Sequence, residues 1–200
     1  MKIKLITSVL LFWATLGAAQ PFSGGRDRLI VGGNIGVFRI SFDSFKRVFD
    51  ERSGMTTGAV AFLKIRPPYY AAVKYHRFEK NKNLTIANIT QAQTWEEQWY
   101  SVGVRYTTYG ERRIVNHLGF GLAFYNIKET GAISVFGQTP GKRSASGFYL
   151  DTGIEYRFIK YASLDFGIEI TSAGIEGKSG FEGSSVGGFV FEAGLNLFLF

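Results

Sequence analysis

The sequence predicts an all-β fold, an eight-stranded antiparallel transmembrane β-barrel. Three observations support this prediction. Apolar and polar residues alternate with period two in eight segments, the connections between these segments are alternately short and long, and the two faces of each segment differ in character. Side chains on a strand point to opposite sides in turn, so each segment presents one apolar and one polar face. Glycine (25 residues) and aromatic residues (16%) are abundant, whereas proline (4 residues) is rare, and this composition suits strands.

The alternation is clearest in residues 147–157. Phe148, Leu150 and Ile154 point to one side, and Asp151 and Glu155 point to the other. A half-buried strand of a soluble protein would alternate in the same way, so the whole set of segments has to be considered. An even number of strands of about this length suits a small barrel. The eight predicted strands are Arg28–Ile40, Thr57–Arg66, Tyr69–Phe78, Glu97–Tyr106, Ile114–Tyr125, Gly147–Arg157, Tyr161–Thr171 and Gly188–Phe200.

The connections are sorted by length. Those after the second, fourth and sixth predicted strands are short, and those after the first, third, fifth and seventh are long and polar. This sorting is typical of an outer-membrane barrel, with short periplasmic turns, long extracellular loops and both termini in the periplasm. The predicted long loops are Ser41–Thr56, Glu79–Glu96, Asn126–Ser146 and Ser172–Gly187.

The volume of the lumen decides which face of the strands points inward. An eight-stranded barrel has an interior only just wide enough for side chains to fill. A soluble barrel such as a lipocalin would have to hold very many large apolar side chains inside and many glycines outside. We therefore predict that the apolar face contacts lipid and that charges and glycines lie inside, with every backbone group paired by closure of the barrel. The predicted interior charge network comprises Lys64, Arg66, Lys74, Arg105, Asp151, Glu155, Arg157, Asp165, Glu169 and Glu192.

In this network, most basic residues come from early strands and the acidic residues come from late strands. Closure of the barrel brings the last strand beside the first, and buried charges have to be paired, so we expect ion pairs across the lumen. We favour a filled, plugged interior, because eight strands leave little lumen. The alternative is a narrow water path whose charges select ions or small solutes.

Aromatic residues gather at the end with short turns, where a girdle at the lipid headgroups is expected. The girdle residues predicted from the sequence are Tyr69, Tyr70, Tyr106, Tyr109, Tyr156, Phe158 and Tyr161.

The first 19 residues predict a cleaved signal peptide, which leaves residues 20–200 as the barrel domain. Lys2 and Lys4 are followed by an apolar run, and Gly17-Ala18-Ala19 forms a small-residue cleavage site. The apolar run is too short to span a membrane comfortably as a helix. We therefore expect export to the bacterial outer membrane. The absence of cysteine excludes disulfides and cysteine nucleophiles.

Two stretches carry a resemblance to a known family. Gly147–Phe158 and Ala193–Phe200 resemble strands of the outer-membrane β-barrel domain family, the small eight-stranded group that includes the barrels of OmpA and OmpX. The resemblance covers essentially the whole mature chain and implies recognition of the C-terminal strand by the barrel assembly machinery. Members end on an aromatic residue with apolar residues at alternate positions before it. Counting back from Phe200 gives Phe198 and Asn196, whereas the apolar row ends on Leu199, so two registers of the last strand remain open.

No catalytic, metal or cofactor site is predicted. Some small barrels of this kind modify lipids, and the deacylases resemble a His-x-Ser pattern, but neither His76 nor His117 is followed by that serine. Both histidines are interpreted as polar residues that fill the lumen. Residues at metal-ligand spacing do not occur, and Gly32–Gly36 lies inside a strand and forms no dinucleotide-binding loop.

The predicted function is therefore structural or surface-interacting, and non-enzymatic. A narrow channel is the second hypothesis and a lipid-modifying enzyme the third. The formal net charge of +7 is scattered along the chain, which suits an anionic lipid surface better than nucleic acid. We expect a monomer that contacts outer-membrane lipid and lipopolysaccharide, with cations available in the long loops at Lys80, Lys82, Lys142 and Arg143.

Overall fold

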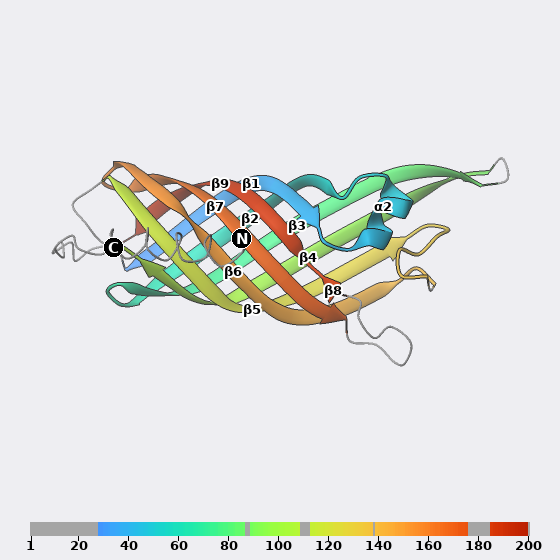
Figure 1. Cartoon of the computed structure of the whole chain (residues 1–200). Helices are drawn as coiled ribbons and strands as arrows, with labels where there is room; N and C mark the ends of the chain where they lie inside the picture. Colours follow the sequence, from blue (N-terminus) through green and yellow to red (C-terminus); the bar gives the residue numbers. More distant parts are fainter. Residues whose placement is uncertain (1–27, 87–88, 109–112, 138, 176–184, 200) are drawn as a thin grey trace, which may run out of the picture.

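The computed structural model describes residues 28–86, 89–108, 113–137, 139–175 and 185–199. The predicted signal peptide (residues 1–19), Tyr109 and Phe200 lie outside this part. The described residues form a closed antiparallel barrel of eight long strands (Figure 1). The strands are β1 (Leu29–Ile40), β2 (Ser53–Arg66), β3 (Tyr69–Ile86), β4 (Ile89–Thr107), β5 (Ile114–Thr130), β6 (Lys142–Ile159), β7 (Ala162–Ile175) and β9 (Gly188–Leu199), with the two-residue strand β8 (Ser185–Val186) beside β7.

The barrel is a meander that closes between its first and last strands. Each long strand pairs with the next along the chain, β7 pairs with β9, and β9 pairs with β1 from Leu29↔Leu199 to Ile40↔Gly188. The predicted eight-stranded antiparallel barrel is confirmed. The short turns lie at one end, which is the periplasmic end in this fold, and the long connections lie at the other.

Several strands continue beyond their predicted ends. The segment 79–96, predicted as a loop, is a β3–β4 hairpin in which pairing continues to Ile86↔Ile89. The segment 41–56 contains the helix α2 (Asp43–Phe49), which the sequence analysis did not predict, and β2 already begins at Ser53. The prediction was wrong here because the lipid-facing pattern ends at this level although the strands go on.

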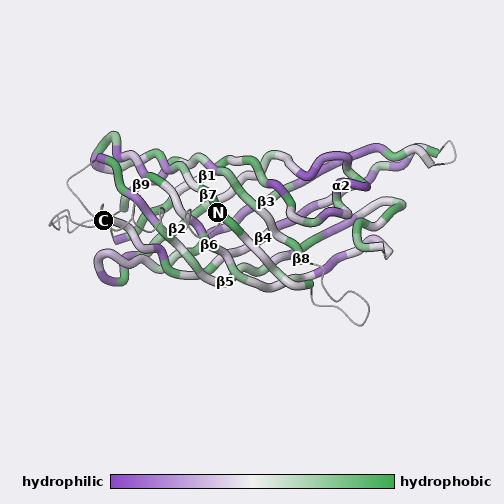
Figure 2. The backbone as a smooth tube through the Cα atoms, viewed as in Figure 1, coloured by the Kyte–Doolittle hydropathy of each residue, from purple (hydrophilic) through white to green (hydrophobic). Residues whose placement is uncertain are grey.

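The inward and outward faces of the barrel wall exchange polarity at the extracellular edge of the lipid-facing band. Within the membrane band of β4, Tyr100 and Val102 point outward, and Ser101 and Arg105 are buried inside. Above it, the polar side chains of Glu96 and Gln98 take the outward positions, and Trp95, Glu97 and Trp99 are buried. The extracellular part of the barrel thus has a mainly apolar interior and a polar exterior, like a soluble protein, and Figure 2 shows more hydrophilic backbone toward this end.

Aromatic pairs mark both edges of the lipid-facing band. Tyr75 and Tyr100 pack with ring centroids 5.1 Å apart at the extracellular edge, and Tyr69 and Tyr106 pack at 5.7 Å at the periplasmic edge. Tyr70, predicted as part of the girdle, is instead buried inside the barrel. Adjacent residues of a strand face opposite sides, so Tyr69 and Tyr70 could not both contact lipid.

The lumen contains two apolar clusters that enclose the charged residues. The periplasmic cluster consists of Ile30, Phe62, Tyr70, Ala72 and Phe198. The extracellular cluster is larger and rich in aromatic residues; the strands contribute Trp95 and Trp99, and α2 contributes Phe45, Val48 and Phe49.

The structure of β9 shows which face of the last strand contacts lipid. Leu197 and Leu199 point outward, and Asn196 and Phe198 are buried, so the apolar row that ends on Leu199 faces lipid. In the described part of the chain, no helix is long and apolar enough to cross a membrane.

Candidate functional site

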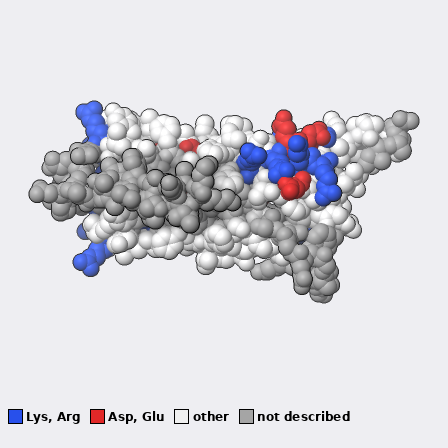
Figure 3. Space-filling view, viewed as in Figure 1, with Lys and Arg blue, Asp and Glu red and all other residues white. Residues whose placement is uncertain are grey.

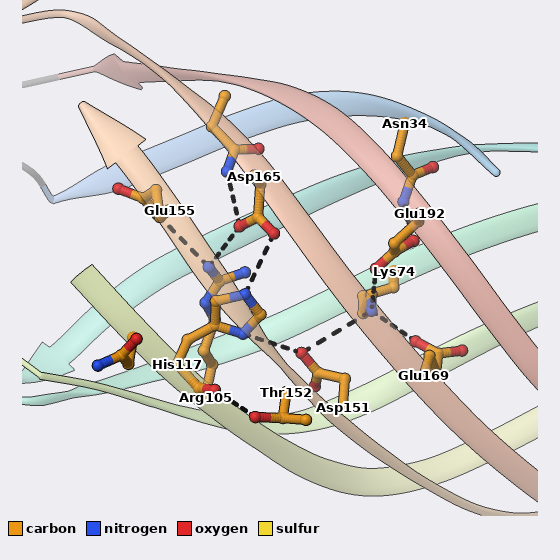
Figure 4. A network of polar contacts seen from close by, with 12 residues as sticks. Asn34, Lys74, Arg105, His117, Asp151, Thr152, Glu155, Asp165, Glu169 and Glu192 are labelled. Carbon is orange, nitrogen blue, oxygen red and sulfur yellow. Dashed lines mark hydrogen bonds and ion pairs between the residues drawn. The ribbon is translucent and has the colours of Figure 1, made fainter. Parts of the chain in front are cut away.

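The central third of the lumen holds a network of charged side chains drawn from most of the strands (Figure 4). Each member occupies an inward position of the period-two pattern, which is why side chains far apart in sequence meet. The core members are Asn34 on β1, Lys74 and His76 on β3, Arg105 on β4, His117 on β5, Asp151 and Glu155 on β6, Asp165 and Glu169 on β7, and Glu192 and Asn196 on β9.

Arg105 is the centre of the periplasmic half of the network. Its Nη2 lies 2.7 Å from Asp165 Oδ2 and 3.4 Å from Glu155 Oε2. Its guanidinium also lies over the ring of Phe62, at 4.2 Å from the centroid. Asn196 donates to the same Oδ2 of Asp165 at 3.3 Å. A buried guanidinium held by two carboxylates is the arrangement in which a buried charge is best compensated.

His117 bridges two carboxylates on neighbouring strands. Its Nε2 lies 3.1 Å from Asp165 Oδ1, and its Nδ1 lies 3.3 Å from Asp151 Oδ2. Gly153 faces the ring: a Cβ at that position would lie 2.6 Å from Nε2. The glycine therefore leaves the space that the imidazole occupies.

Lys74 is the centre of the extracellular half. Its Nζ lies 2.5 Å from Glu169 Oε2, 3.1 Å from Glu192 Oε1 and 4.0 Å from Asp151 Oδ2. Asp151 thus connects both halves of the network, through His117 on one side and Lys74 on the other.

Glu192 has two further polar contacts. Asn34 donates from Nδ2 to Oε2 at 2.5 Å, and His76 Nε2 lies 3.0 Å from the same oxygen. His76 also stacks on Trp99, with ring centroids 4.9 Å apart, and Trp99 donates from Nε1 to Glu169 Oε1 at 3.1 Å. Trp99 therefore joins the charged network to the extracellular aromatic cluster.

One group of these residues has the composition of a metal site. Ligand atoms of His76, Glu169 and Glu192 lie within 4.8 Å of one another. The ammonium group of Lys74 contacts both carboxylates and supplies the positive charge that they require. Sequence spacing did not indicate this group, because its members come from three different strands.

The structure places the ten residues predicted for the network in three environments. Seven of them, namely Lys74, Arg105, Asp151, Glu155, Asp165, Glu169 and Glu192, lie together in the centre. Arg157 joins at the periplasmic edge, where it is half-buried and donates from Nε to Glu155 Oε1 at 2.9 Å. Lys64 is half-buried near the same end.

Arg66 differs from the prediction. Its side chain is exposed, and it lies beyond a register shift between Lys64 and Arg66 at the periplasmic end of β2. The shift pairs Arg66 with the outward residue Tyr69, so a period-two count carried across it assigns Arg66 to the wrong face.

Two buried carboxylates in the extracellular cluster were not predicted. Glu129 accepts from Ser134 Oγ at 2.7 Å and from the backbone N–H of Val135, and so fixes the loop after β5. Glu97 accepts from Trp95 Nε1 at 3.0 Å. Burial raises the pKa of Glu97 to about 7, and the hydrogen bond from Trp95 opposes this rise in part. Both residues lie on the inward side when the strands are counted in steps of two, and this count could have identified them. The predicted fifth strand ended before Glu129, however, so Glu129 was not considered.

The packing leaves little free space around the charges. A cavity of about 10 Å³ lies between the two halves of the network, lined by residues that include Asn34, Lys74, Arg105, Asp165 and Asn196. A cavity of this volume holds about one water molecule at most.

Comparison with known proteins identifies the fold. No protein-family model and no curated protein sequence matches the chain. Among solved structures, neisserial surface protein A superposes with a TM-score of 0.64 at 15% identity, over 88% of this chain and 99% of that one. OprG from Pseudomonas aeruginosa gives 0.56 at 12% identity, over 84% and 94%. The N-terminal β-barrel domain of Pseudomonas aeruginosa OprF gives 0.53 at 12% identity, over 86% and 98%. The chain therefore has the fold of the small eight-stranded outer-membrane barrels, and this fold supports a location in the bacterial outer membrane.

Proposed function

We propose that this protein is a closed outer-membrane barrel that acts through its extracellular surface, without conduction through the lumen and without catalysis. The observation that carries the proposal is the filling of the lumen by three successive layers. The extracellular layer is aromatic, the central layer is an ion-paired network, and the periplasmic layer is apolar.

An open ion path would require all three layers to give way. In the central layer, Lys74 and Arg105 would each have to leave carboxylates at 2.5 and 2.7 Å. Separating a buried ion pair leaves uncompensated charges and costs about 3–5 kcal/mol. In the extracellular layer, Trp95 and Trp99 are almost completely buried, so they would have to move as well.

The enzyme hypothesis finds no support in the positions of the histidines. His76 and His117 lie inside the lumen, and both are engaged by carboxylates. A lipid-modifying enzyme needs its nucleophile and base where an acyl ester can reach them. The wall of the barrel separates both histidines from the lipid.

The extracellular surface offers contacts for lipopolysaccharide, which we propose as the lipid partner. On the face shown in Figure 3, Lys and Arg gather at the two ends of the barrel, and the extracellular group is mixed with acidic residues. Lys128 and Lys142 are both exposed and lie directly opposite each other on β5 and β6. Like charges at such a position are destabilising. Glu96 lies opposite Lys128 on β4 but is paired with Arg77 at 3.1 Å, so it offsets this repulsion only in part, and a phosphate of lipopolysaccharide would relieve the rest.

The other loop cations already have roles within the protein. Lys80 contacts Glu51 at 3.0 Å, Lys82 contacts Asp50 at 2.8 Å, and the guanidinium of Arg143 lies 4.7 Å from the ring centroid of Phe136. These residues hold the loops against the barrel. We also propose that the protein is monomeric within its own membrane and that β9 is the strand presented to the barrel assembly machinery.

Conductance in planar lipid bilayers tests the proposal. We expect the folded protein to insert without producing discrete channel openings. A double variant, Trp95→Ala with Trp99→Ala, serves as the comparison, because it removes the largest side chains of the extracellular layer. Steady unitary openings of the unaltered protein would refute the closed barrel and establish the channel hypothesis.

A further inference from the structure

The β3–β4 hairpin is the part of the barrel that projects furthest at the extracellular end (Figure 1). Pairing between its strands continues without interruption from Tyr69↔Tyr106 to Ile86↔Ile89. The neighbouring strands end earlier: β2 pairs with β3 only up to Thr56↔Phe78, and β5 pairs with β4 only from Thr94↔Thr130. The outer part of the hairpin is therefore a two-stranded ribbon.

The β4 edge of this ribbon is open. Within the described part of the chain, the backbone of Ile89–Ala92 has β3 on one side and no strand on the other. The loop after β5 reaches only as far as Gln93, whose side chain bonds the backbone of Ile133. On the β3 edge, Lys80 and Lys82 bond backbone oxygens of Ser53 and Val48. Asn83–Ile86 beyond them also have no second strand beside them in the described part of the chain, but Lys82 directly borders that segment, whereas the nearest charge on β4 is Glu96. An open edge presents unpaired N–H and C=O groups, which can pair with another strand.

The sequence of the ribbon lacks the features that normally protect such an edge. Residues 83–93 (Asn-Leu-Thr-Ile-Ala-Asn-Ile-Thr-Gln-Ala-Gln) contain no charge, proline or glycine. Natural edge strands are usually blunted by lysine, proline or a bulge. Charges return directly below the ribbon, at Lys82 on β3 and Glu96 on β4. The uncharged stretch thus coincides with the open edge.

We propose that this edge pairs with the same edge of a second copy of the protein in a facing membrane. In a two-fold symmetric pair, each surface meets its own copy, and two identical strand edges can then run antiparallel. A pair centred on Gln91 places Gln91 against Gln91 and Thr90 against Ala92, with no like charges in contact. β4 runs from the hairpin tip toward its own membrane, so an antiparallel partner runs toward the opposite side. The second barrel must therefore stand in another membrane, and this contact is a homotypic adhesion that rests on the proposed surface role.

A single contact of this kind is weak. Three residues on each strand, Thr90–Ala92, supply only a few hydrogen bonds, each worth about 1 kcal/mol net. Many copies facing one another between two membranes add their contacts, so avidity converts weak pairs into stable adhesion. The pairing therefore predicts clustering of membranes but no stable dimer of the dilute protein in detergent.

Clustering of phosphatidylcholine vesicles that carry the folded protein tests the inference, with turbidity and light scattering as the readout. We expect the unaltered protein to cluster the vesicles. Gln91→Lys places two ammonium groups opposite each other and should abolish clustering. Asn83→Lys adds the same charge to the opposite edge of the ribbon, on β3, and should leave clustering intact. Dispersed vesicles with the unaltered protein, or equal clustering by Gln91→Lys and the unaltered protein, would overturn the proposal.

A disulfide provides a second readout that does not depend on charge. The chain contains no cysteine, so Gln91→Cys introduces a single thiol at the centre of the pair. Mixing two vesicle populations that carry size-distinguishable forms of this variant should give heterodimers under mild oxidation, whereas Asn83→Cys should give far fewer. Equal yields from both variants would contradict the pairing. Bilayer conductance of the same preparations tests the closed barrel separately, so the two proposals can fail independently.

Discussion

Glu97 is a buried carboxylate with a single hydrogen bond from a side chain. Its Oε2 accepts a hydrogen bond from Trp95, whereas its Oε1 is buried and has no hydrogen-bond partner within the described part of the chain. The outward neighbours Glu96 and Gln98 are polar, which places Glu97 above the lipid-facing band. An ionised carboxylate at this position is surrounded by aromatic side chains and accepts one hydrogen bond. Its burial therefore favours the protonated form.

This position predicts a pH dependence of stability. The pKa of Glu97 rises from 4.5 to about 7 on folding, so between these values the folded state binds more proton than the unfolded state. Stability then falls as pH rises through this range and changes no further above it. From pH 4 to pH 8, the ionisation of Glu97 should lower the free energy of unfolding by roughly 3 kcal/mol. We expect Glu97→Gln to remove this decrease.

Urea unfolding in detergent micelles at the two pH values measures this effect. Glu79→Gln, at an exposed position on the neighbouring strand, should retain the behaviour of the unaltered protein. A Glu97→Gln variant with the same pH dependence as the unaltered protein would show that Glu97 is ionised in the folded state.

The inward or outward side of each charge was predictable from the sequence, but its partners were not. Period two places Asp151 and Asp165 inside, and the structure agrees. That His117 lies between them depends on the stagger of three strands, which the sequence pattern does not fix. Arg66 and Tyr70 show two further limits. A register shift places Arg66 opposite the outward residue Tyr69, and strict alternation places Tyr70 in the lumen.

At the scale of elements, α2 is a short helix that depends on its contacts. Seven residues are too few for a stable isolated helix, so packing must supply its stability. Phe45 stacks on Phe49 with centroids 4.6 Å apart and meets Trp95 edge-on at 5.3 Å. Lys82 donates to Val48 O at 3.1 Å, near the C-terminal end where a cation complements the helix dipole.

We expect Lys82→Ala to loosen α2 while the barrel stays closed. Lys82 is partly exposed, so its two contacts should contribute about 1 kcal/mol after solvent screening. Amide hydrogen exchange followed by mass spectrometry should then show roughly fivefold faster exchange in residues 43–50 and no change in the membrane-spanning parts of the strands. Lys128→Ala, on the distant strand β5, is the matched control. Unchanged exchange in α2 would mean that its aromatic contacts alone hold it.

The existence of eight strands was predictable, and their lengths were not. A lipid-facing strand shows an apolar outer row, and this row ends where the barrel leaves the membrane. β3 and β4 continue beyond that level with the opposite polarity, so the same alternation no longer indicates a transmembrane strand there. The helix α2 escaped prediction because its apolar residues Phe45, Val48 and Phe49 cover little more than one turn.

For the whole molecule, the reversal of polarity along the axis explains how the barrel closes its lumen. Inside the membrane, the outer wall must be apolar, so the polar residues fill the interior and pair with one another. Outside the membrane, water contacts the wall, so aromatic residues can fill the interior instead. The same strands carry both arrangements, and Trp99 connects them through Glu169 and His76.

The closed lumen is the central claim, and the reactivity of a single thiol at its centre tests it most directly. Ser101 lies inside the barrel opposite Lys74 and is completely buried, and the chain has no cysteine of its own. We predict that Ser101→Cys resists a small charged methanethiosulfonate reagent while the protein is folded and reacts after unfolding, whereas Thr85→Cys on the exposed hairpin reacts in both states. Modification of folded Ser101→Cys at a rate close to that of Thr85→Cys would show a continuous water path through the barrel and contradict the closed lumen.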